Sequence, residues 1–307
     1  MNFGVKYKTI KLILNGLSRN IMNWFIIFEY IINHAIIPDK LYLSLLYRTK
    51  FGKRLDWQKP KTFNEKLNWL KIYDRRPQYT NYVDKFKVRE YVEKTIGEKY
   101  LIPLFGVWDN PDEIDFNKLP NQFVLKCNHD SGGLCICKDK TNFDIESAKA
   151  KLKRSLKKDY FIEGREWPYK NVPRKIIAEK YMIDSIVNEI RDYKFFCFNG
   201  IPKAIFIATD RQNEKEETKF DFFDMEFNHL DFTHGHPNAK KIPRKPKNFE
   251  LMKKLAAKLS TGIPQIRIDL YEINGKVYFG EMTLFHHSGL VPFNPRKWDY
   301  IFGSWIK

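Results

Sequence analysis

Apolar residues in the first quarter of the chain recur every three or four positions, which is the spacing of amphipathic helices. Thr62 stands three residues before Glu65, and this pair has the pattern of a capping box at the start of a helix. The sequence therefore predicts a helix over residues 63–72, and a second amphipathic run predicts one continuous helix over 79–94. Residues 1–75 are expected to form a mainly helical N-terminal region.

From residue 101 onward, short apolar or alternating runs are separated by Pro, Gly and Asn, a pattern typical of strands. The predicted strands cover residues 123–127, 134–137, 176–181, 193–198 and 204–208, and runs at 145–157 and 248–260 predict further helices. Turns such as Asn199-Gly200 favour antiparallel hairpins, and the sequence has no regular strand–helix alternation. The expected fold class is therefore α+β.

The clearest pattern is at residues 267–283, which alternate, turn at Asn274-Gly275 and alternate again. A two-residue loop would pair 273 with 276 and place Asp269 and Glu281 on opposite faces. A three-residue loop, with Gly275 in the left-handed conformation, would pair 272 with 276 and place both acids on one face. We expect the longer loop, with Arg267 across from Glu281, because only that register lets the two acids share a metal ion.

In that register one face of the hairpin is apolar and the other carries charge. The apolar face would contain Ile266, Ile268, Leu270, Tyr278 and Met282, and the polar face Arg267, Asp269, Glu281 and Thr283. Two carboxylates are typical Mg²⁺ ligands in sites that also bind phosphate. A solvent-facing hairpin with cross-strand ion pairs would show the same spacing, so the pattern alone leaves both readings open.

Composition narrows the class of partner. The chain has 307 residues, with 54 Lys and Arg against 37 Asp and Glu, and a formal charge of +17. This balance favours nucleotides, nucleic acid, acidic glycans or an anionic membrane surface as partners. The four cysteines do not form a disulfide framework and no secretory signal is visible, so we expect a cytoplasmic protein.

Residues 21–37 are the one stretch of the sequence that suggests a membrane. Asn23, Glu29, Asn33 and His34 interrupt its apolar run, and a central Glu is costly in lipid. We interpret the stretch as a buried or partner-facing helix. A helix lying at the inner face of the membrane is the alternative, which would make the protein peripheral there.

Three further groups could bind a nucleotide. Lys126 precedes the turn Ser131-Gly132-Gly133, whose backbone N–H groups could hold phosphates. Glu179, Lys180, Tyr181 and Met182 leave a strand edge that could face an adenine and a ribose, and Asp192 and Lys194 follow on the next strand.

Rival chemistries draw on other residues. Cys127, His129, Cys135 and Cys137 lie close enough in sequence to ligate zinc, although no Cys-x-x-Cys spacing is present. Asp221 and Asp224 could imitate the acidic metal motif of a sugar-nucleotide transferase. His286 and His287 follow the strand of Glu281 and could reach its site.

Taken in order, these features resemble the ATP-grasp superfamily, and most closely its TupA-like branch, which is associated with teichuronopeptide and capsular polysaccharide synthesis. The matching stretches are residues 60–67, 84–89, 123–129, 192–196 and 280–283, within a likeness that covers most of 38–303. The resemblance implies a helical region at 1–75, a small lobe at 76–180 and a large lobe at 181–307, with ATP between the lobes.

The resemblance also implies roles for the residues that match. Lys85 and Lys126 would contact phosphates together with Ser131, Gly132 and Gly133, and Glu179, Lys180, Tyr181, Met182 and Asp192 would bind adenine and ribose. Asp269, Glu281 and Thr283 would hold Mg²⁺, and Arg267 and Lys194 would be catalytic. The sequence departs from the family pattern at Thr283, where many members have Asn, and in its helical start, where many have a Rossmann-like domain.

The implied activity is that of an ATP-dependent carboxylate–amine ligase, which forms an amide through an acyl phosphate. The carboxylate would belong to a uronic acid or a surface glycan, and the nucleophile would be an amine or an amino acid. Nucleic acid is not an expected partner. A glycosyltransferase of capsule or lipopolysaccharide assembly, using Asp221 and Asp224, is the alternative.

Overall fold

The structure is a computed structural model that describes residues 37–184, 191–210 and 216–307. The apolar stretch at 21–37 lies outside the described residues except for its last residue. Within the described ranges, no helix is both long enough and apolar enough to cross a membrane.

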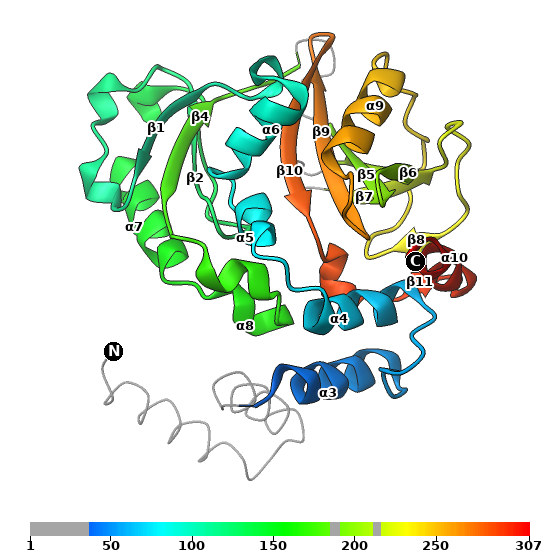
Figure 1. Cartoon of the computed structure of the whole chain (residues 1–307). Coiled ribbons are helices and arrows are strands. Elements are labelled where there is room, and N and C mark those ends of the chain that lie inside the picture. The colour runs from blue at the N-terminus through cyan, green and yellow to red at the C-terminus, as the bar shows by residue number, and fades with distance from the viewer. Residues whose placement is uncertain (1–36, 185–190, 211–215) are drawn as a thin grey trace.

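Two antiparallel sheets form the framework, and Figure 1 shows them side by side. The first has the order β1-β4-β2-β3, with strands β1 (Leu104–Trp108), β2 (Phe123–Cys127), β3 (Cys135–Cys137) and β4 (Ile176–Lys180). The second has the order β10-β9-β5-β6-β7, with strands β5 (Asp192–Phe198), β6 (Ile201–Thr209), β7 (Lys219–Phe223), β9 (Ile266–Ile273) and β10 (Lys276–Thr283). A small sheet pairs β8 (Thr233–His234) with β11 (Phe293–Asn294). The α+β prediction is confirmed.

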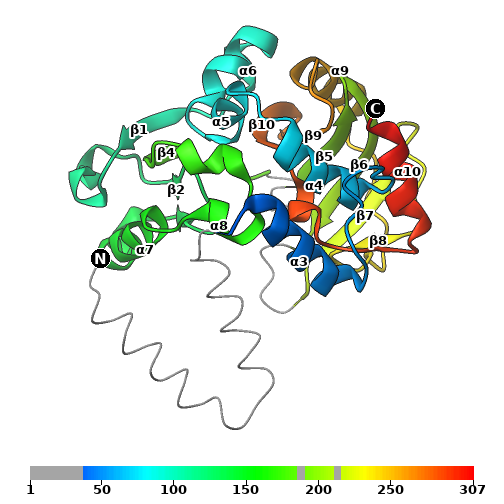
Figure 2. The ribbon, with the colours of Figure 1, turned by 60° about the horizontal axis from the view of Figure 1, so that its bottom comes forward.

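Helices cover the sheets and join them. They are α3 (Asp39–Phe51), α4 (Phe63–Tyr73), α5 (Gln78–Val83), α6 (Val88–Ile96), α7 (Ile145–Leu156), α8 (Tyr160–Gly164), α9 (Phe249–Leu259) and α10 (Lys297–Trp305). Short 3₁₀ helices include η5 (Trp167–Asn171) and η6 (His286–Gly289). Helix α7 packs on the first sheet and α9 on the second, and Figure 2 shows α3, α4 and α8 gathered on one side of the molecule. The division of the chain at residues 75 and 180 stays a prediction.

Helix α4 begins as the sequence predicts. Thr62 Oγ1 accepts a hydrogen bond from the Glu65 backbone N–H (3.2 Å), and the Glu65 carboxylate accepts one from the Thr62 N–H (3.1 Å). The buried side of α4 faces an aromatic core, in which Phe63 makes edge-to-face contacts with Phe196, Phe293 and Phe302 at ring distances of 5.7–6.0 Å. The N-terminal helical region is thereby fixed to the second sheet.

The prediction of one helix over 79–94 was wrong, because the segment breaks into α5 and α6. At the break, Asp84 Oδ1 accepts hydrogen bonds from the backbone N–H groups of Phe86 (2.8 Å) and Lys87 (3.2 Å), an alternative to the helical pattern. The Lys85 N–H instead donates to the Asn128 carbonyl at the end of β2 (3.1 Å). The break therefore binds Lys85 to the first sheet.

The loop prediction for the β9–β10 hairpin was also wrong. Asn274 and Gly275 both have positive φ, 50° and 72°, and form a two-residue turn that pairs Ile273 with Lys276. A β-bulge at Gly280 then shifts the register by one residue, so Asp269 lies directly opposite Glu281. The two acids share a face as expected, but through the bulge and not through a longer loop.

The bulge also corrects the assignment of the two faces. Arg267 lies across from Thr283, not from Glu281, and Tyr278 pairs with Tyr271 before the bulge, away from the core face. Val277 and Phe279, both buried, take the core positions.

Gly280 leaves little room for a side chain. A Cβ there would lie 3.0 Å from the Asp269 carbonyl oxygen and 3.0 Å from the Tyr271 ring. We expect Gly280→Ala to lower the free energy of unfolding by about 1–3 kcal/mol through overpacking, measured by urea denaturation. An unchanged midpoint with unchanged slope would show that the bulge relaxes without cost.

Candidate active site between the two sheets

The register of the second sheet places one row of side chains across all five strands. Phe222 pairs with Phe206, Phe206 with Lys194, Lys194 with Asp269, and Asp269 with Glu281. Directly opposite residues in antiparallel strands point to the same face. The row therefore runs from an aromatic end on β7 and β6 to an ionic end on β5, β9 and β10.

Arg267 contacts both acids at the ionic end of this row. Its Nε donates to Asp269 Oδ1 (2.7 Å), and its Nη2 donates to Asp269 Oδ2 (2.7 Å), Glu281 Oε1 (3.1 Å) and Thr283 Oγ1 (3.0 Å). Lys194 Nζ also pairs with Asp269 Oδ2, so the carboxylate of Asp269, which has no exposed surface, is held between two cations. Such pairing is what allows a carboxylate to be fully buried.

The same cations set the protonation of Glu281. Burial alone would raise the pKa of Glu281, but the charges of Lys85, Lys194 and Arg267 together lower it well below its usual range. Glu281 is the more open of the two acids, with 37% of its side chain exposed. It is therefore an ionised carboxylate facing solvent-accessible space at neutral pH.

That space is a cavity of about 340 Å³, lined by residues of the second sheet and by residues next to the first sheet. The predicted residues that line it are Lys85, Ser131, Lys194, Arg267, Glu281 and Thr283, joined by His286 and His287. Lys85 is oriented by donating to the Asp130 carbonyl (2.6 Å), and three cationic side chains thus face one concave site. Such a site suits a phosphate group or a carboxylate.

A second cavity, of about 260 Å³, contains most of the other predicted nucleotide residues. Lys126, Glu179, Lys180, Tyr181, Met182 and Asp192 line it, with Ile102, Val124 and Ile273 among its apolar neighbours. Glu179 Oε2 pairs with Lys126 Nζ (2.6 Å), and its Oε1 accepts from Arg89 Nη1 (3.4 Å). An apolar slot with a few polar groups at its rim is typical of a nucleoside site.

Gly132 and Gly133 lie outside both cavities. Gly132 has a φ of 137°, which favours glycine, and Gly133 packs so closely that a Cβ would lie 2.1 Å from Ser155 Oγ. The turn that they form carries Ser131 into the first cavity. Their binding of phosphate stays a prediction.

The donor set fits a magnesium ion through Glu281. Its Oε2 accepts no hydrogen bond from the described residues, and Thr283 Oγ1 lies beside its Oε1 at 3.4 Å. Asp269 is directly opposite, but both its oxygens are paired with Arg267 and Lys194, so it could ligate a metal only if one of these cations turned away. The predicted ligands are thus together, with Glu281 the most accessible.

Residues 65–307 match the sequence profile described as TupA-like ATPgrasp. The chain belongs to the TupA-like ATP-grasp family. No curated protein sequence matches it significantly.

Several solved structures resemble this TupA-like protein at low identity. A D-alanine–D-alanine ligase from Bacillus anthracis complexed with ATP is 15% identical, with a TM-score of 0.38 over 66% of this chain and 54% of that one. The D-alanine–D-alanine ligase from Helicobacter pylori is 14% identical, with a TM-score of 0.42 over 80% and 69%. N5-carboxyaminoimidazole synthase from Aspergillus clavatus, in complex with ADP and 5-aminoimidazole ribonucleotide, is 14% identical, with a TM-score of 0.38 over 72% and 47%. The chain thus spans about half the length of two of these proteins.

The structure does not support the zinc site that the sequence suggested around the three neighbouring cysteines. Cys127, Cys135 and Cys137 are buried in the core beside the first sheet, where burial raises the pKa of each thiol, and their Sγ atoms face backbone carbonyls. Among the described residues, they form no metal-binding group with His129. They are packed thiols, not zinc ligands.

The acids proposed for a sugar-nucleotide site have structural partners. Asp221 is fully buried and accepts hydrogen bonds from the Ala239 N–H (3.2 Å) and, through its other oxygen, contacts His229 Nε2 (3.1 Å). Asp224 accepts from the backbone N–H groups of Glu226 and Asn228 and so closes the turn after β7. Each carboxylate is thus engaged by neighbours in its own local structure.

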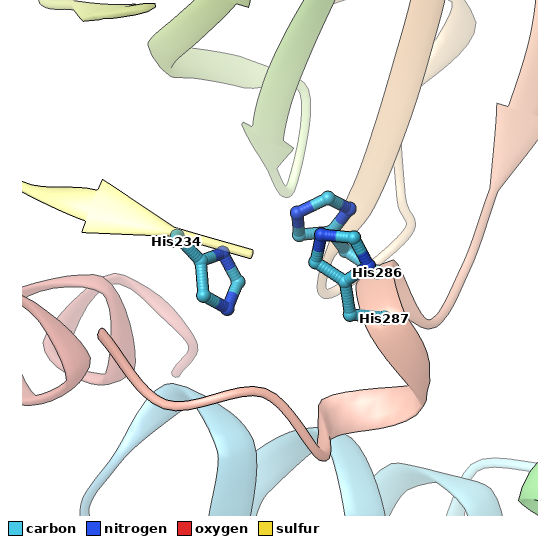
Figure 3. A group of neighbouring side chains, drawn as sticks. All are labelled: His234, His286 and His287. Atoms are coloured by element: carbon cyan, nitrogen blue, oxygen red, sulfur yellow. The ribbon is translucent and has the colours of Figure 1, made fainter. Parts of the chain in front are cut away.

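His286 and His287 do reach the active-site cavity, and His234 joins them (Figure 3). Their nearest ring nitrogens lie within 4.8 Å of one another, which is close enough to consider a metal centre. However, Arg267 Nη1 can only donate, so His286 Nδ1 must accept (2.7 Å) and the proton of the neutral ring lies on Nε2. His286 therefore presents an N–H to the cluster and no lone pair, and we interpret the three rings as neutral polar walls.

Burial keeps these rings neutral. It lowers the pKa of His234 and His286 well below the usual value, and with Arg267 and His236 it lowers the pKa of His287 to about 4.

Several residues that line the cavity were not predicted from the sequence, and four of them are polar. They are Tyr160 on α8, Glu166 and Tyr169 at η5, and Ser288 on η6. No local pattern in the sequence marks them, because they meet the site only through the packing of α8 and η5 against η6. Gly280 was missed too, although a lone glycine inside an alternating strand is a known signal for a bulge.

The neutral state of His287 makes stability depend on pH. The unfolded chain binds this proton between about pH 6.5 and pH 4 and the folded chain does not, so stability falls as the pH drops through that range. His287 has a φ of 48°, a conformation that Asn tolerates better than most residues. Between about pH 7.5 and pH 5, the free energy of unfolding should fall by about 2 kcal/mol less in His287→Asn than in the wild type. Urea denaturation at the two pH values measures this difference. Equal losses in the two proteins would contradict a buried neutral ring.

Proposed function

We propose that this protein is an ATP-dependent carboxylate–amine ligase that forms an amide through an acyl phosphate on a uronic-acid-containing surface or capsular polysaccharide. The observation that carries the proposal is the cavity in which Lys85, Lys194 and Arg267 face Glu281, with Asp269 buried beneath and paired to Lys194 and Arg267. Membership of the TupA-like ATP-grasp family supports ATP as the phosphoryl donor.

The two cavities suit the two ends of ATP. The apolar slot between Val124 and Ile273, with Tyr181 and Met182 at its wall, would take the adenine, and Glu179 and Asp192 would reach the ribose. Lys126 lies in the slot, while Lys85 lies in the neighbouring ionic cavity, and the two charges are close enough to affect each other. The triphosphate would therefore run along these lysines from the slot toward Arg267.

The chemistry needs charge stabilisation more than covalent help. A substrate carboxylate attacks the γ-phosphorus of ATP, its oxygen bonds to the phosphoryl group, and ADP leaves. An amine then adds to the acyl carbon, phosphate leaves, and an amide remains. Arg267 and Lys194 lie where they would neutralise the oxygens of the transferred phosphoryl group, because both already bind carboxylate oxygens at the cavity floor. Bound Mg²⁺, held by Glu281 and Asp269 with Thr283 nearby, would supply Lewis acidity to the phosphate oxygens.

An acidic glycan is favoured as the acceptor by charge. A further concave surface of about 820 Å³ is lined, among the described residues, by five cationic side chains and two acids. The cations are Arg191, Lys219, Lys240, Lys241 and Arg244, and the acids are Asp210 and Glu216. This surface lies at the end of β5 and β6 where Asp192 pairs with Ala208. A basic surface at the strand end that carries Asp192 of the apolar slot, on a chain of net charge +17, suits a polyanion that enters the site by one of its carboxylates.

A screen for ADP release tests the activity. The wild-type protein is incubated with ATP, Mg²⁺, uronic acids or uronate glycans, and a panel of amino acids and amines. We expect Glu281→Gln to lower ADP release by at least about 100-fold, because the accessible metal carboxylate is lost. Asp269→Asn should have a similar effect, since it also leaves Arg267 and Lys194 without their shared partner.

Glu226→Gln, at an exposed glutamate in the turn after β7, is the matched control and should keep the wild-type rate. Circular dichroism of each variant checks that the fold is intact. ADP release by Glu281→Gln at the wild-type rate would place the metal site elsewhere, and release of UDP from a sugar nucleotide would favour the glycosyltransferase alternative.

A further inference from the structure

Glu166 is a buried carboxylate in the active-site cavity that neither the nucleotide nor the metal ion requires. It stands at the start of η5, is 5% exposed, and lines the cavity together with Tyr160 and Tyr169. Its Oε1 accepts a hydrogen bond from Ser288 Oγ, and its Oε2 accepts none from the residues that the structure describes. A buried carboxylate with an open oxygen is costly unless a ligand uses it.

Ser288 is held against Glu166 by a strained turn. His287, Ser288 and Gly289 all have left-handed φ, 48°, 53° and 60°, and such a conformation costs about 1 kcal/mol or more for each non-glycine residue. Consecutive strain of this kind persists only where the surroundings fix it, and it is concentrated at functional sites.

Lys71 is the group that fixes the turn. Its fully buried Nζ donates to the carbonyls of Ser288 (2.7 Å) and Gly164 (2.7 Å) and lies 3.4 Å from Asn68 Oδ1. Gly164 allows the close approach, because a Cβ there would lie 2.3 Å from Ser288 Oγ. Helix α4, the end of α8 and η6 are thus locked together around the Glu166–Ser288 contact.

The distribution of charge in the cavity indicates which kind of ligand Glu166 would bind. Its other charged walls are three cations, Lys85, Lys194 and Arg267, which attract phosphate and carboxylate, and two acids. Glu281 is already neutralised by these cations, and the carboxylate of Asp130 accepts a hydrogen bond from Ser155 Oγ. Glu166 would repel an anion. The group that it would attract is a cation small enough to enter an enclosed site beside two phenols, which is the chemistry of an ammonium.

We propose that Glu166 binds the amine substrate and accepts its proton during amide formation, with Ser288 orienting the carboxylate. This role rests on the proposed ligase function. The substrate arrives as an ammonium ion and gives one proton to Glu166. The free amine adds to the acyl carbon, the C–N bond forms, the C–O bond to the phosphate breaks, and the phosphate leaves with the second proton. Glu166 then releases its proton to solvent.

The surroundings of Glu166 suit a base. Burial raises its pKa, against the lowering effects of Lys71 on α4, of Ser288 on η6 and of Arg267 on β9, while Glu163 on α8 raises it further. A carboxylate with a raised pKa is a better proton acceptor near neutral pH.

The test separates the two half-reactions. D-glucuronate serves as the acid, and L-glutamate or hydroxylamine serves as the nucleophile in separate assays. Hydroxylamine is uncharged near neutral pH and traps the acyl phosphate as a hydroxamate without help from a base. We expect Glu166→Gln to lower amide formation by at least about 100-fold, while hydroxamate formation falls by less than about 5-fold. The KM for L-glutamate should rise and the KM for ATP should not change.

Glu226→Gln, at an exposed glutamate in the turn after β7 and outside the cavity, is the matched control and should match the wild type in both assays. Hydroxamate formation by Glu166→Gln also shows that the variant is folded. If it does not fold, Ser288→Ala removes only the hydroxyl that orients Glu166 and should raise the KM for L-glutamate selectively.

The outcomes distinguish the two proposals. Equal losses of amide and hydroxamate in Glu166→Gln, or no loss of either, would overturn the role of Glu166 and leave the ligase function standing. A wild-type protein that releases no ADP and forms no hydroxamate with any uronic acid would overturn the ligase function itself.

Discussion

Asp269 is the constraint on which the site depends, because its carboxylate has no exposed surface and lies on β9, an interior strand of the second sheet. A carboxylate in that position must be paired on both oxygens, and Arg267 and Lys194 do this from its own strand and the next. The pairing draws two long cationic side chains onto the cavity floor. What stabilises the fold is therefore also what gives the cavity its attraction for anions.

The position of Glu281 adds a second condition. A regular two-residue hairpin would turn Glu281 to the opposite face, and the bulge at Gly280 returns it to the side of Asp269. The bulge thereby keeps the favourable two-residue turn and also brings Glu281 beside Asp269 and Arg267. Within β10, Gly280 is the one residue left without a partner on the neighbouring strand. A larger residue would be crowded there, since a Cβ would lie 3.0 Å from both the Asp269 carbonyl oxygen and the Tyr271 ring.

The sequence predicted the parts of the fold that have local causes. The capping box of Thr62 and Glu65, the alternation in the strands and the positive φ of Asn274 and Gly275 are set by near neighbours. It also identified Arg267, Asp269 and Glu281 as one polar face, although it explained that face by the wrong turn. The helix break at Asp84 could have been anticipated only with knowledge of Asn128, which is far away in the chain and binds both Asp84 and Lys85.

No sequence pattern marks Glu166, and its proposed role rests on the residues that surround it. Glu281 is compensated by three cations, so an incoming ammonium gains little from it. Glu166 has Lys71 nearby, but the Lys71 ammonium is directed at Gly164, Ser288 and Asn68, and burial lowers its pKa to about 8. Lys71 therefore donates its hydrogen bonds to groups around the strained turn and none to Glu166, so one oxygen of Glu166 stays unpaired among the described residues. On the proposed function, an ammonium that enters the cavity would be drawn away from the compensated Glu281 and toward Glu166.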